Sequence, residues 1–295
     1  MKIEKIAVLG GGQMGTGIAE AAASKGVEVA LIKATPGSSD KARGSIEKSL
    51  GRLVEKEKLT QADADGVLAH ITFTDDLKAA ADADLFVESI VEDVEIKKKR
   101  FAEADKIVKP EGILASNTST LGIASMRDAT KRPGRFLGLH FFNPATVMKL
   151  VEVIPTEATD ADAVAAAVAF VEKIGKTPVL VKDRTGFIVN RLLTPYMCDA
   201  IRCLEDGLAD VGGIDTAMQL GANHPMGPLA LADYIGLDIV SAMAENLYES
   251  FGKDYMAPPA LLKKLLKAGK LGRKTKLGFY DYSKRPPEPN PELAG

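Results

Sequence analysis

The stretch KIAVLGGGQMGTGIAEAAASKGVEVALIK, Lys5–Lys33, decides the fold of this 295-residue chain. An alanine-rich segment, Met14–Lys25, lies between two short apolar runs, Lys5–Gly10 and Val27–Lys33. Gly26 follows directly after this segment. Short apolar runs are typical of buried strands, and a glycine after the last turn is typical of a helix end. The order strand, helix, strand predicts a βαβ unit, from which parallel sheets are built.

Three glycines from the end of the first predicted strand to the start of the helix have the GxGxxG spacing of dinucleotide-binding proteins: Gly10, Gly12 and Gly15. A lone match is weak evidence, but this one follows a strand and opens a helix, as the fingerprint requires. The first glycine permits a tight turn, the second lets the backbone approach a pyrophosphate, and the third allows close helix–strand packing. We predict a dinucleotide site here, with Gln13 and Met14 in the same loop taking part.

The end of the second predicted strand departs from the usual NAD pattern. An acidic residue normally binds the adenosine ribose at this position, and this chain has Lys33. A lysine cannot accept a hydrogen bond from a 2′-hydroxyl group, but it can pair with a 2′-phosphate. Either Lys33 favours the use of NADP, or it points to solvent while backbone groups hold the ribose.

The alternation of strands and helices continues to about residue 184. The further strand-like runs are Asp84–Glu88, Ile113–Ser116, Phe136–His140, Lys149–Val153 and Thr177–Lys182. We predict a Rossmann-like, doubly wound, mostly parallel sheet over residues 1–184, with a charged helical hairpin inserted at about 40–70. The helix-period segments that follow, Val189–Leu204, Ile214–Leu220, Pro228–Ser250 and Pro258–Ala268, predict a smaller all-α domain over residues 185–283. The proline-rich residues 284–295 are predicted to be disordered.

The composition excludes several classes of protein. Hydrophobic residues make up 46% and charged residues 26%, and the net charge of −2 gives no general attraction to nucleic acid or to an anionic membrane. No apolar run reaches the roughly eighteen residues of a membrane span, and we expect no secretory signal from the sequence at the N-terminus. Cys198 and Cys203 fit neither a metal-ligand spacing nor a disulfide framework, so we expect a cytoplasmic protein with reduced cysteines and no metal.

Two adjoining strand-like runs carry a histidine and a carboxylate. Both lie in FLGLHFFNPATVMKLVEVIP, Phe136–Pro155, which predicts two strands joined by a turn at Asn143-Pro144. If the strands run side by side, His140 and Glu152 can meet. A carboxylate bonded to one imidazole nitrogen fixes the tautomer and raises the basicity of the other nitrogen, which makes a general base. The alternative is a buried histidine that a neighbouring acid merely satisfies.

Three other segments have polar residues with two possible interpretations. ASNTST, Ala115–Thr120, follows a strand, so Asn117 and Ser119 could bind nicotinamide or substrate, or could form a polar turn and helix cap. Asn190 lies in the apolar segment GFIVNRLL and must find a partner, either as an interdomain cap or as a substrate ligand. The charged arm at about 40–70 is either a solvated hairpin or a site for a phosphorylated ligand.

Together these motifs resemble the 3-hydroxyacyl-CoA dehydrogenase family, and within it the single-function 3-hydroxybutyryl-CoA dehydrogenases. The similarity covers nearly the whole chain through GGGQMGTGIA, ASNTST, GLHFFNPATVMKLVEVI, KDRTGFIVNRLL, HPMGPLALADYIGLD and LGRKTKLGFYDY, in the family's order. It implies an enzyme that exchanges a hydride between C3 of a short-chain 3-hydroxyacyl-CoA and a nicotinamide cofactor. The alternatives are a 3-hydroxyacid dehydrogenase that does not bind CoA and a non-catalytic, crystallin-like relative.

The resemblance also implies a role for each matching residue. His140 would be the general base and Glu152 its orienting partner, with Ser119 and Asn190 at the reacting oxygen and thioester. Contacts to the dinucleotide are implied for Glu92, Lys97, Ser119, Asn143 and Lys274, and contacts to CoA for Ser49, Lys56, Ser119 and Asn190. Asn117 is a further candidate for the dinucleotide from its position after the strand alone. Lys33 stands where the family has an aspartate, which tilts the cofactor choice toward NADP. Pairing of two copies through the helical domain is implied as well.

Overall fold

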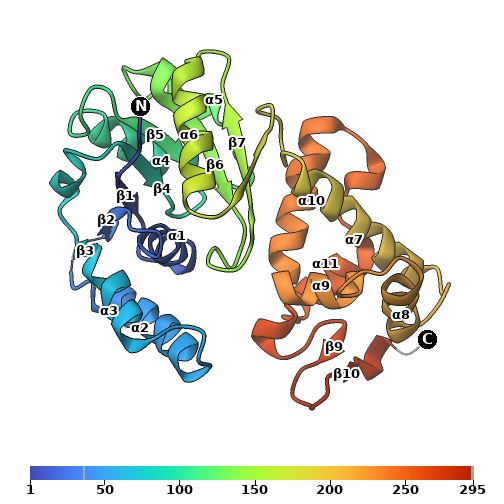
Figure 1. Ribbon diagram of the computed structural model, residues 1–295. Coiled ribbons are helices and arrows are strands. Elements are labelled where there is room, and N and C mark those ends of the chain that lie inside the picture. Colours follow the sequence, from blue (N-terminus) through green and yellow to red (C-terminus); the bar gives the residue numbers. More distant parts are fainter. Residues whose placement is uncertain (36, 294–295) are drawn as a thin grey trace. The chain divides into compact units, whose positions relative to one another are not determined.

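The computed structural model describes residues 1–35 and 37–293, in two compact units that divide between Arg184 and Thr185 (Figure 1). The first unit is built on an eight-stranded sheet in the order β3-β2-β1-β4-β5-β6-β7-β8. Its strands are β1 (Lys5–Leu9), β2 (Glu28–Ile32), β3 (Ile71–Thr74), β4 (Leu85–Glu88), β5 (Ile113–Ser116), β6 (Phe136–Phe141), β7 (Leu150–Pro155) and β8 (Thr177–Leu180). β6 and β7 pair antiparallel, and every other pair of neighbours in this sheet is parallel. The predicted mostly parallel, Rossmann-like sheet is confirmed.

Helices cover both faces of this sheet. They are α1 (Gln13–Ala23), α2 (Asp40–Glu55), α3 (Gln61–Ala69), α4 (Val94–Ala104), α5 (Ala124–Arg127) and α6 (Ala161–Lys173), with 3-10 turns η1 (Leu77–Ala80) and η2 (Pro133–Arg135). Alternate residues of β4 point to opposite faces. Leu85 and Val87 belong to the apolar cluster that includes α1 and α6. Phe86 packs edge-on against Phe101 of α4, and Phe101 packs edge-on against Phe136 of β6, with ring centroids 6.2 and 4.8 Å apart. Because both faces are covered, β4 is apolar from Leu85 to Val87.

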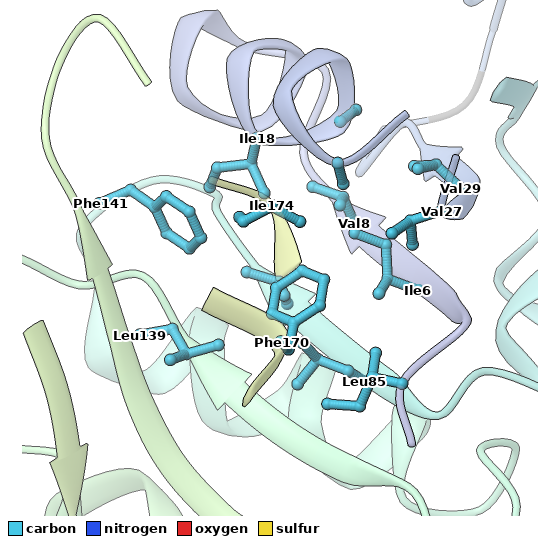
Figure 2. Close-up of a cluster of buried hydrophobic side chains, with 14 of the residues drawn as sticks. Ile6, Val8, Ile18, Val27, Val29, Leu85, Leu139, Phe141, Phe170 and Ile174 are labelled. Atoms are coloured by element: carbon cyan, nitrogen blue, oxygen red, sulfur yellow. The ribbon is translucent and has the colours of Figure 1, made fainter. Parts of the chain in front are cut away.

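The larger cluster lies between the sheet and the helices α1 and α6. Figure 2 shows Ile18 of α1 and Phe170 of α6 beside strand residues such as Val8 and Leu139. Burying such side chains removes apolar area from water at about 25 cal/mol per Å², which is the main stabilising term for a sheet of this kind. This packing holds in place the strands whose carboxyl ends lead into the polar segments described below.

The charged arm folds as two helices, α2 and α3. Ala42, Ile46 and Leu50, spaced four residues apart, are buried in the same cluster as α1. The basic residues of α2 and of the turn that follows lie outside this apolar face and are exposed: Lys41, Arg43, Lys48, Arg52, Lys56 and Lys58. A capping box between Thr60 and Asp63 begins α3. The arm therefore has one buried apolar face and one basic, solvated face.

Strand β3 was not among the strands predicted from the sequence. It has only four residues, ITFT, and it lies at the outer edge of the sheet directly after the arm. The run alternates apolar and polar residues, but four residues are the minimum length for this pattern to indicate a strand, and only Ile71 is buried. Pairing with β2 makes it a strand, and a short sequence window does not contain that partner.

The second unit is helical. It contains α7 (Val189–Glu205), α8 (Val211–Gly221), α9 (Pro228–Ile235), α10 (Leu237–Phe251) and α11 (Ala260–Lys267), with η3 (Asp254–Met256), η4 (Arg273–Thr275), η5 (Pro291–Leu293) and the short strands β9 (Tyr280–Asp281) and β10 (Glu288–Pro289). The segment predicted as one helical run, Pro228–Ser250, is divided by Gly236, whose φ of +108° ends α9. Among residues 1–35 and 37–293, no helix is long and apolar enough to span a membrane.

The proline-rich segment after residue 283 folds onto its own unit. β10 pairs antiparallel with β9, and the buried Asn290 donates from Nδ2 to the Gly278 carbonyl oxygen over 2.8 Å. The composition predicts disorder here, and the structure differs because one buried amide and one strand pair hold the segment as far as Leu293. Residues 294–295 of the predicted tail lie outside the described residues.

Candidate active site

Four parallel strands of the first unit end at the same edge of the sheet. β1, β4, β5 and β6 are neighbours, and their carboxyl ends lead into the glycine loop, residues 89–92, residues 117–120 and residues 142–149 respectively. Open α/β sheets bind ligands at this edge. Most of the site residues predicted in the first unit therefore lie in or beside loops of one edge.

The glycine loop has the shape that a pyrophosphate requires. Gly10 has φ +132°, and a Cβ atom there would stand 2.1 Å from the Ser89 carbonyl oxygen. A Cβ atom on Gly15 would stand 1.9 Å from the Gly10 carbonyl oxygen, so both positions exclude any side chain. At Gly12, the N-cap of α1, a Cβ atom would meet nothing within 4 Å, and within the described chain no side chain caps this helix. The open helix start offers backbone N–H groups to an anion, so the loop fits a bound dinucleotide.

His140 and Glu152 form a buried pair. They stand directly opposite each other in the antiparallel register of β6 and β7, so their side chains share one face of the sheet. His140 Nδ1 lies 2.7 Å from Glu152 Oε2, and the two residues are 3% and 0% exposed. The Phe142 ring lies over the imidazole with centroids 4.5 Å apart, which restricts its orientation. The two side chains meet as predicted, whereas their catalytic role stays a prediction.

Ser119 faces the other imidazole nitrogen. When Nδ1 donates to the Glu152 carboxylate, Nε2 of His140 carries a lone pair, and the Ser119 hydroxyl lies 3.2 Å from it. Asn117, two residues earlier, accepts a hydrogen bond from the Phe141 N–H over 2.8 Å and donates to Ser89 Oγ over 3.1 Å. Asn117 thus joins the ends of β4, β5 and β6. This positions the loop in which Ser119 approaches the imidazole.

Glu92 and Lys97 belong to an ionic network that is buried at Lys97 and Glu88 and exposed at Glu92. Lys97 is 1% exposed and donates to Glu88 Oε1 over 2.6 Å, and its ammonium lies 3.2 Å from Glu92 Oε2. The other oxygen of Glu92 accepts hydrogen bonds from residues 118–120. Burial opposes the ionisation of Glu92, but the Lys97 charge and the hydroxyl donors outweigh it and hold the pKa of Glu92 below its usual range.

The sequence analysis missed Glu88, Thr118 and Thr120 as members of this site. Glu88 closes an otherwise apolar strand, LFVE, and an acid in that position needs a buried partner. The position of this acid at the end of an apolar strand could therefore have indicated Glu88 as a buried member of the site. The threonines lie in the quoted motif ASNTST, but nothing local indicates that their hydroxyls bond to a carboxylate more than twenty residues earlier.

The predicted CoA contacts lie on and beside α2. Ser49 donates from Oγ to Oε1 of Glu20, a buried residue of α1, over 2.9 Å. Burial raises the pKa of the Glu20 carboxyl group, and the Ser49 hydroxyl partly offsets this. Lys56 follows α2 and is exposed. Asn143 is exposed in the loop after β6.

Lys33 follows β2 directly. Its Nζ atom lies 3.1 Å from where a Cβ atom on Gly37 would stand, so the ammonium is folded over the loop between β2 and α2. Arg100 reaches the same loop and donates from Nη2 to the Ala34 carbonyl oxygen over 2.7 Å. Two cationic side chains therefore flank the strand end at which an adenosine ribose is usually held.

The helical unit carries the remaining two predicted residues. Asn190 is half-buried in the first turn of α7, shortly after Phe187, which has a positive φ of 47°. Lys274 lies in η4 and donates to Asp238 Oδ2 over 2.6 Å.

Comparison with known proteins finds full-length similarity. Residues 5–184 match the model of the "3-hydroxyacyl-CoA dehydrogenase, NAD binding domain", and residues 186–282 match that of the family's C-terminal domain. A probable 3-hydroxybutyryl-CoA dehydrogenase of Deinococcus radiodurans is 48% identical over 94% of this chain and 100% of its own. The 3-hydroxybutyryl-CoA dehydrogenase of Clostridioides difficile is 45% identical over 95% of this chain and 100% of its own. The crystal structure of (S)-3-hydroxybutyryl-CoA dehydrogenase from Ralstonia eutropha superposes with a TM-score of 0.92 at 41% identity, covering 96% of this chain and 100% of that one.

Proposed function

This chain belongs to the 3-hydroxyacyl-CoA dehydrogenase family, and we propose that it exchanges a hydride between C3 of 3-hydroxybutyryl-CoA and a nicotinamide dinucleotide, giving acetoacetyl-CoA in the oxidative direction. The observation that carries the proposal is the buried His140–Glu152 pair with the Ser119 hydroxyl at Nε2 of the ring. With Nδ1 bonded to the carboxylate, Nε2 is the ring nitrogen that can accept a proton beside this hydroxyl group.

The His140 imidazole moves the proton. Its Nε2 atom takes the proton of the C3 hydroxyl in oxidation and returns it to the ketone oxygen in reduction. Concerted loss of this proton prevents positive charge from accumulating at C3 as the hydride departs. The Glu152 carboxylate at Nδ1 stabilises the imidazolium that forms and keeps the ring from turning.

Ser119 supplies a hydroxyl donor beside the same nitrogen, and we assign it to the reacting oxygen. The dinucleotide, when bound at the loop of Gly10, Gly12 and Gly15, supplies or accepts the hydride. The buried surroundings of His140 and Glu152 limit the access of water to the proton-transfer step.

The arm is proposed to bind CoA. Exposed basic residues on α2 and its C-terminal turn suit the phosphates of CoA, and Lys56 and Ser49 are the residues that the family resemblance implies. Asn190 in the helical unit is assigned to the thioester, and Asn143 and Lys274 to the dinucleotide, on the same ground.

The cofactor that we propose includes NADP in addition to NAD. The family model describes an NAD-binding domain, and this chain places Lys33 and Arg100 around the loop after β2. Two cations attract a 2′-phosphate, and no acid stands at position 33 to repel it. We therefore propose that NADPH is used, in preference to NADH or beside it.

A turnover assay tests the function. Purified protein is mixed with acetoacetyl-CoA and either NADH or NADPH, and loss of the reduced-nicotinamide absorbance is followed, with free acetoacetate as the matched substrate without CoA. We expect turnover of the thioester only. Equal rates on free acetoacetate would indicate a hydroxyacid dehydrogenase that does not use CoA, and no turnover with either substrate would indicate a non-catalytic relative.

A further inference from the structure

We propose that Lys176 is a positioning residue for the dinucleotide: its buried ammonium group holds the segment of residues 142–149 in the place from which Asn143 reaches the cofactor. This inference rests on the proposed function, which assigns Asn143 to the dinucleotide. It adds a residue outside the motifs that carry the family resemblance, in the turn between α6 and β8.

The segment between β6 and β7 has little support of its own. Residues 142–149 belong to no helix or strand, and Ala145 is the one buried residue among these eight. Inside the segment, the N–H groups of Val147 and Met148 both donate to the Pro144 carbonyl oxygen over 3.0 Å. A segment so exposed needs anchors from other elements to keep a single position.

Lys176 supplies two of these anchors from one atom. Its Nζ donates to the Ala145 carbonyl oxygen over 2.5 Å and to the Met148 carbonyl oxygen over 2.7 Å. The backbone of this lysine is itself fixed, because its N–H donates to the Val171 carbonyl oxygen of α6 over 3.1 Å. β8 begins at the next residue and pairs with β7. The ammonium therefore ties the segment to the end of α6 and to the sheet.

The burial of this ammonium group has a cost. Lys176 is 9% exposed, and burial lowers the pKa of its side chain. Taking a cation out of water is unfavourable unless hydrogen bonds replace those to water, so the two carbonyl contacts must offset that cost. An apolar side chain of the same length would avoid the cost, but it would leave both carbonyl oxygens without this donor.

The anchored segment lies beside the helix that begins at the glycine loop. A Cβ atom on Gly17 of α1 would stand 3.1 Å from the Ala145 Cβ atom, so Ala145 packs closely on this helix. Asn143 precedes Ala145 by two residues. His140, in contrast, is held by the β6–β7 ladder and by Glu152. Loss of the anchor should therefore weaken cofactor binding and leave the proton-transfer pair in place.

Lys176→Met tests this because methionine is similar in length and donates no hydrogen bond. We expect the NADH dissociation constant, measured by fluorescence titration, to rise about tenfold, since the variant loses charge-assisted bonds that fix the segment. The KM for NADH should rise with it. At saturating NADH, kcat should stay within about threefold of that of the unaltered protein, and the KM for acetoacetyl-CoA should not change.

The matched control is Lys173→Met. Lys173 is an exposed lysine at the end of α6, and its Nζ donates to the Ile3 carbonyl oxygen over 3.1 Å, away from the segment. It should leave the NADH dissociation constant unchanged. Lys176→Gln is a second variant that keeps a polar group in the buried position should the methionine variant fail to fold. Its amide is one bond shorter and uncharged, so NADH binding should weaken in the same direction.

A double-mutant cycle tests whether Lys176 acts through Asn143. Asn143→Ala should raise the NADH dissociation constant, and adding Lys176→Met should raise it by less than about twofold more, because the group being positioned is already absent. Losses that multiply in the double variant would overturn the proposal. An unchanged NADH dissociation constant in the folded Lys176 variants would overturn it as well, as would a fall in kcat with normal NADH binding.

Hydrogen exchange gives a readout that does not depend on turnover. In the protein without ligands, the amides of Val147 and Met148 should exchange faster in the Lys176 variants than in Lys173→Met. Equal exchange rates would refute the anchoring. Failure of the proposed function would look different, since the unaltered protein would then not reduce acetoacetyl-CoA, whatever the exchange rates of this segment.

Discussion

The substitution Glu152→Gln tests how much of the catalysis depends on one buried charge. Glutamine keeps nearly the same volume and can still accept a hydrogen bond from His140 Nδ1, so the geometry should survive. What disappears is the negative charge, 2.7 Å from the ring nitrogen in a residue that is fully buried. Only the state with a protonated imidazole requires that charge. The variant should therefore bind its substrates normally and react slowly.

The size of the loss follows from the geometry. The centres of the carboxylate and imidazolium charges are about 4 Å apart when the nearest atoms bond, which gives about 4 kcal/mol at an effective dielectric constant near 20. One decade in rate corresponds to about 1.4 kcal/mol, so kcat should fall by about 10³-fold. This lies within the range of about 10²–10⁴-fold for general acid–base catalysis.

The assay is steady-state reduction of acetoacetyl-CoA at saturating cofactor, with the NADH dissociation constant measured separately. Glu157→Gln is the control, because it removes the same charge from an exposed position soon after β7. The double variant with His140→Gln should lose little more than the worse of the two single variants, since the two residues act as a unit. A Glu152→Gln enzyme with kcat within threefold of the unaltered protein would refute the electrostatic reasoning.

Three further results are expected. Lys56→Ala should raise KM for acetoacetyl-CoA with little change in kcat, because a phosphate contact is the same in the ground and transition states. The control Lys78→Ala, at another exposed lysine, should change neither constant. An unchanged KM in Lys56→Ala at low salt would indicate that the arm is only a solvated surface. Lys33→Asp should shift the ratio of the kcat/KM values for NADPH and NADH toward NADH, since a charge-assisted bond to a 2′-phosphate contributes about 1.5–3 kcal/mol. If the unaltered protein prefers NADH and the ratio does not change in the variant, Lys33 has no part in cofactor selection. The helical unit should form a homodimer that covers exposed apolar side chains such as Leu208 and Leu220, which are 75% and 82% exposed. A monomer in light scattering at micromolar concentration would contradict this.

Local patterns were sufficient for the sheet and for the catalytic pair. Each strand that the sequence analysis named is present, because apolar runs bounded by glycine or proline need only their own composition to be recognised. His140 and Glu152 were found because their strands follow each other in the chain and pair antiparallel, which brings the two residues opposite each other. The strand that was missed, β3, exists through its pairing with β2.

The contacts around Ser119 depend on distant parts of the chain. Glu92 bonds to residues 26–28 positions later, and Ser116 bonds to Glu88 across two neighbouring strands. No periodicity encodes which donors a buried carboxylate will find. Lys97 illustrates this, because its 1% exposure and its two carboxylate partners are features that no local pattern indicates, while its predicted contact with the dinucleotide stays a prediction.

The most direct test of the central claim is the kcat of His140→Gln for the reduction of acetoacetyl-CoA, measured with saturating NADH beside the NADH dissociation constant. If Nε2 of His140 carries the proton between the imidazole and the C3 oxygen, kcat falls by about 10²–10⁴-fold while cofactor binding stays near that of the unaltered protein. A His140→Gln enzyme that turns over at nearly the unaltered rate would contradict the assignment of the His140–Glu152 pair as the catalytic centre.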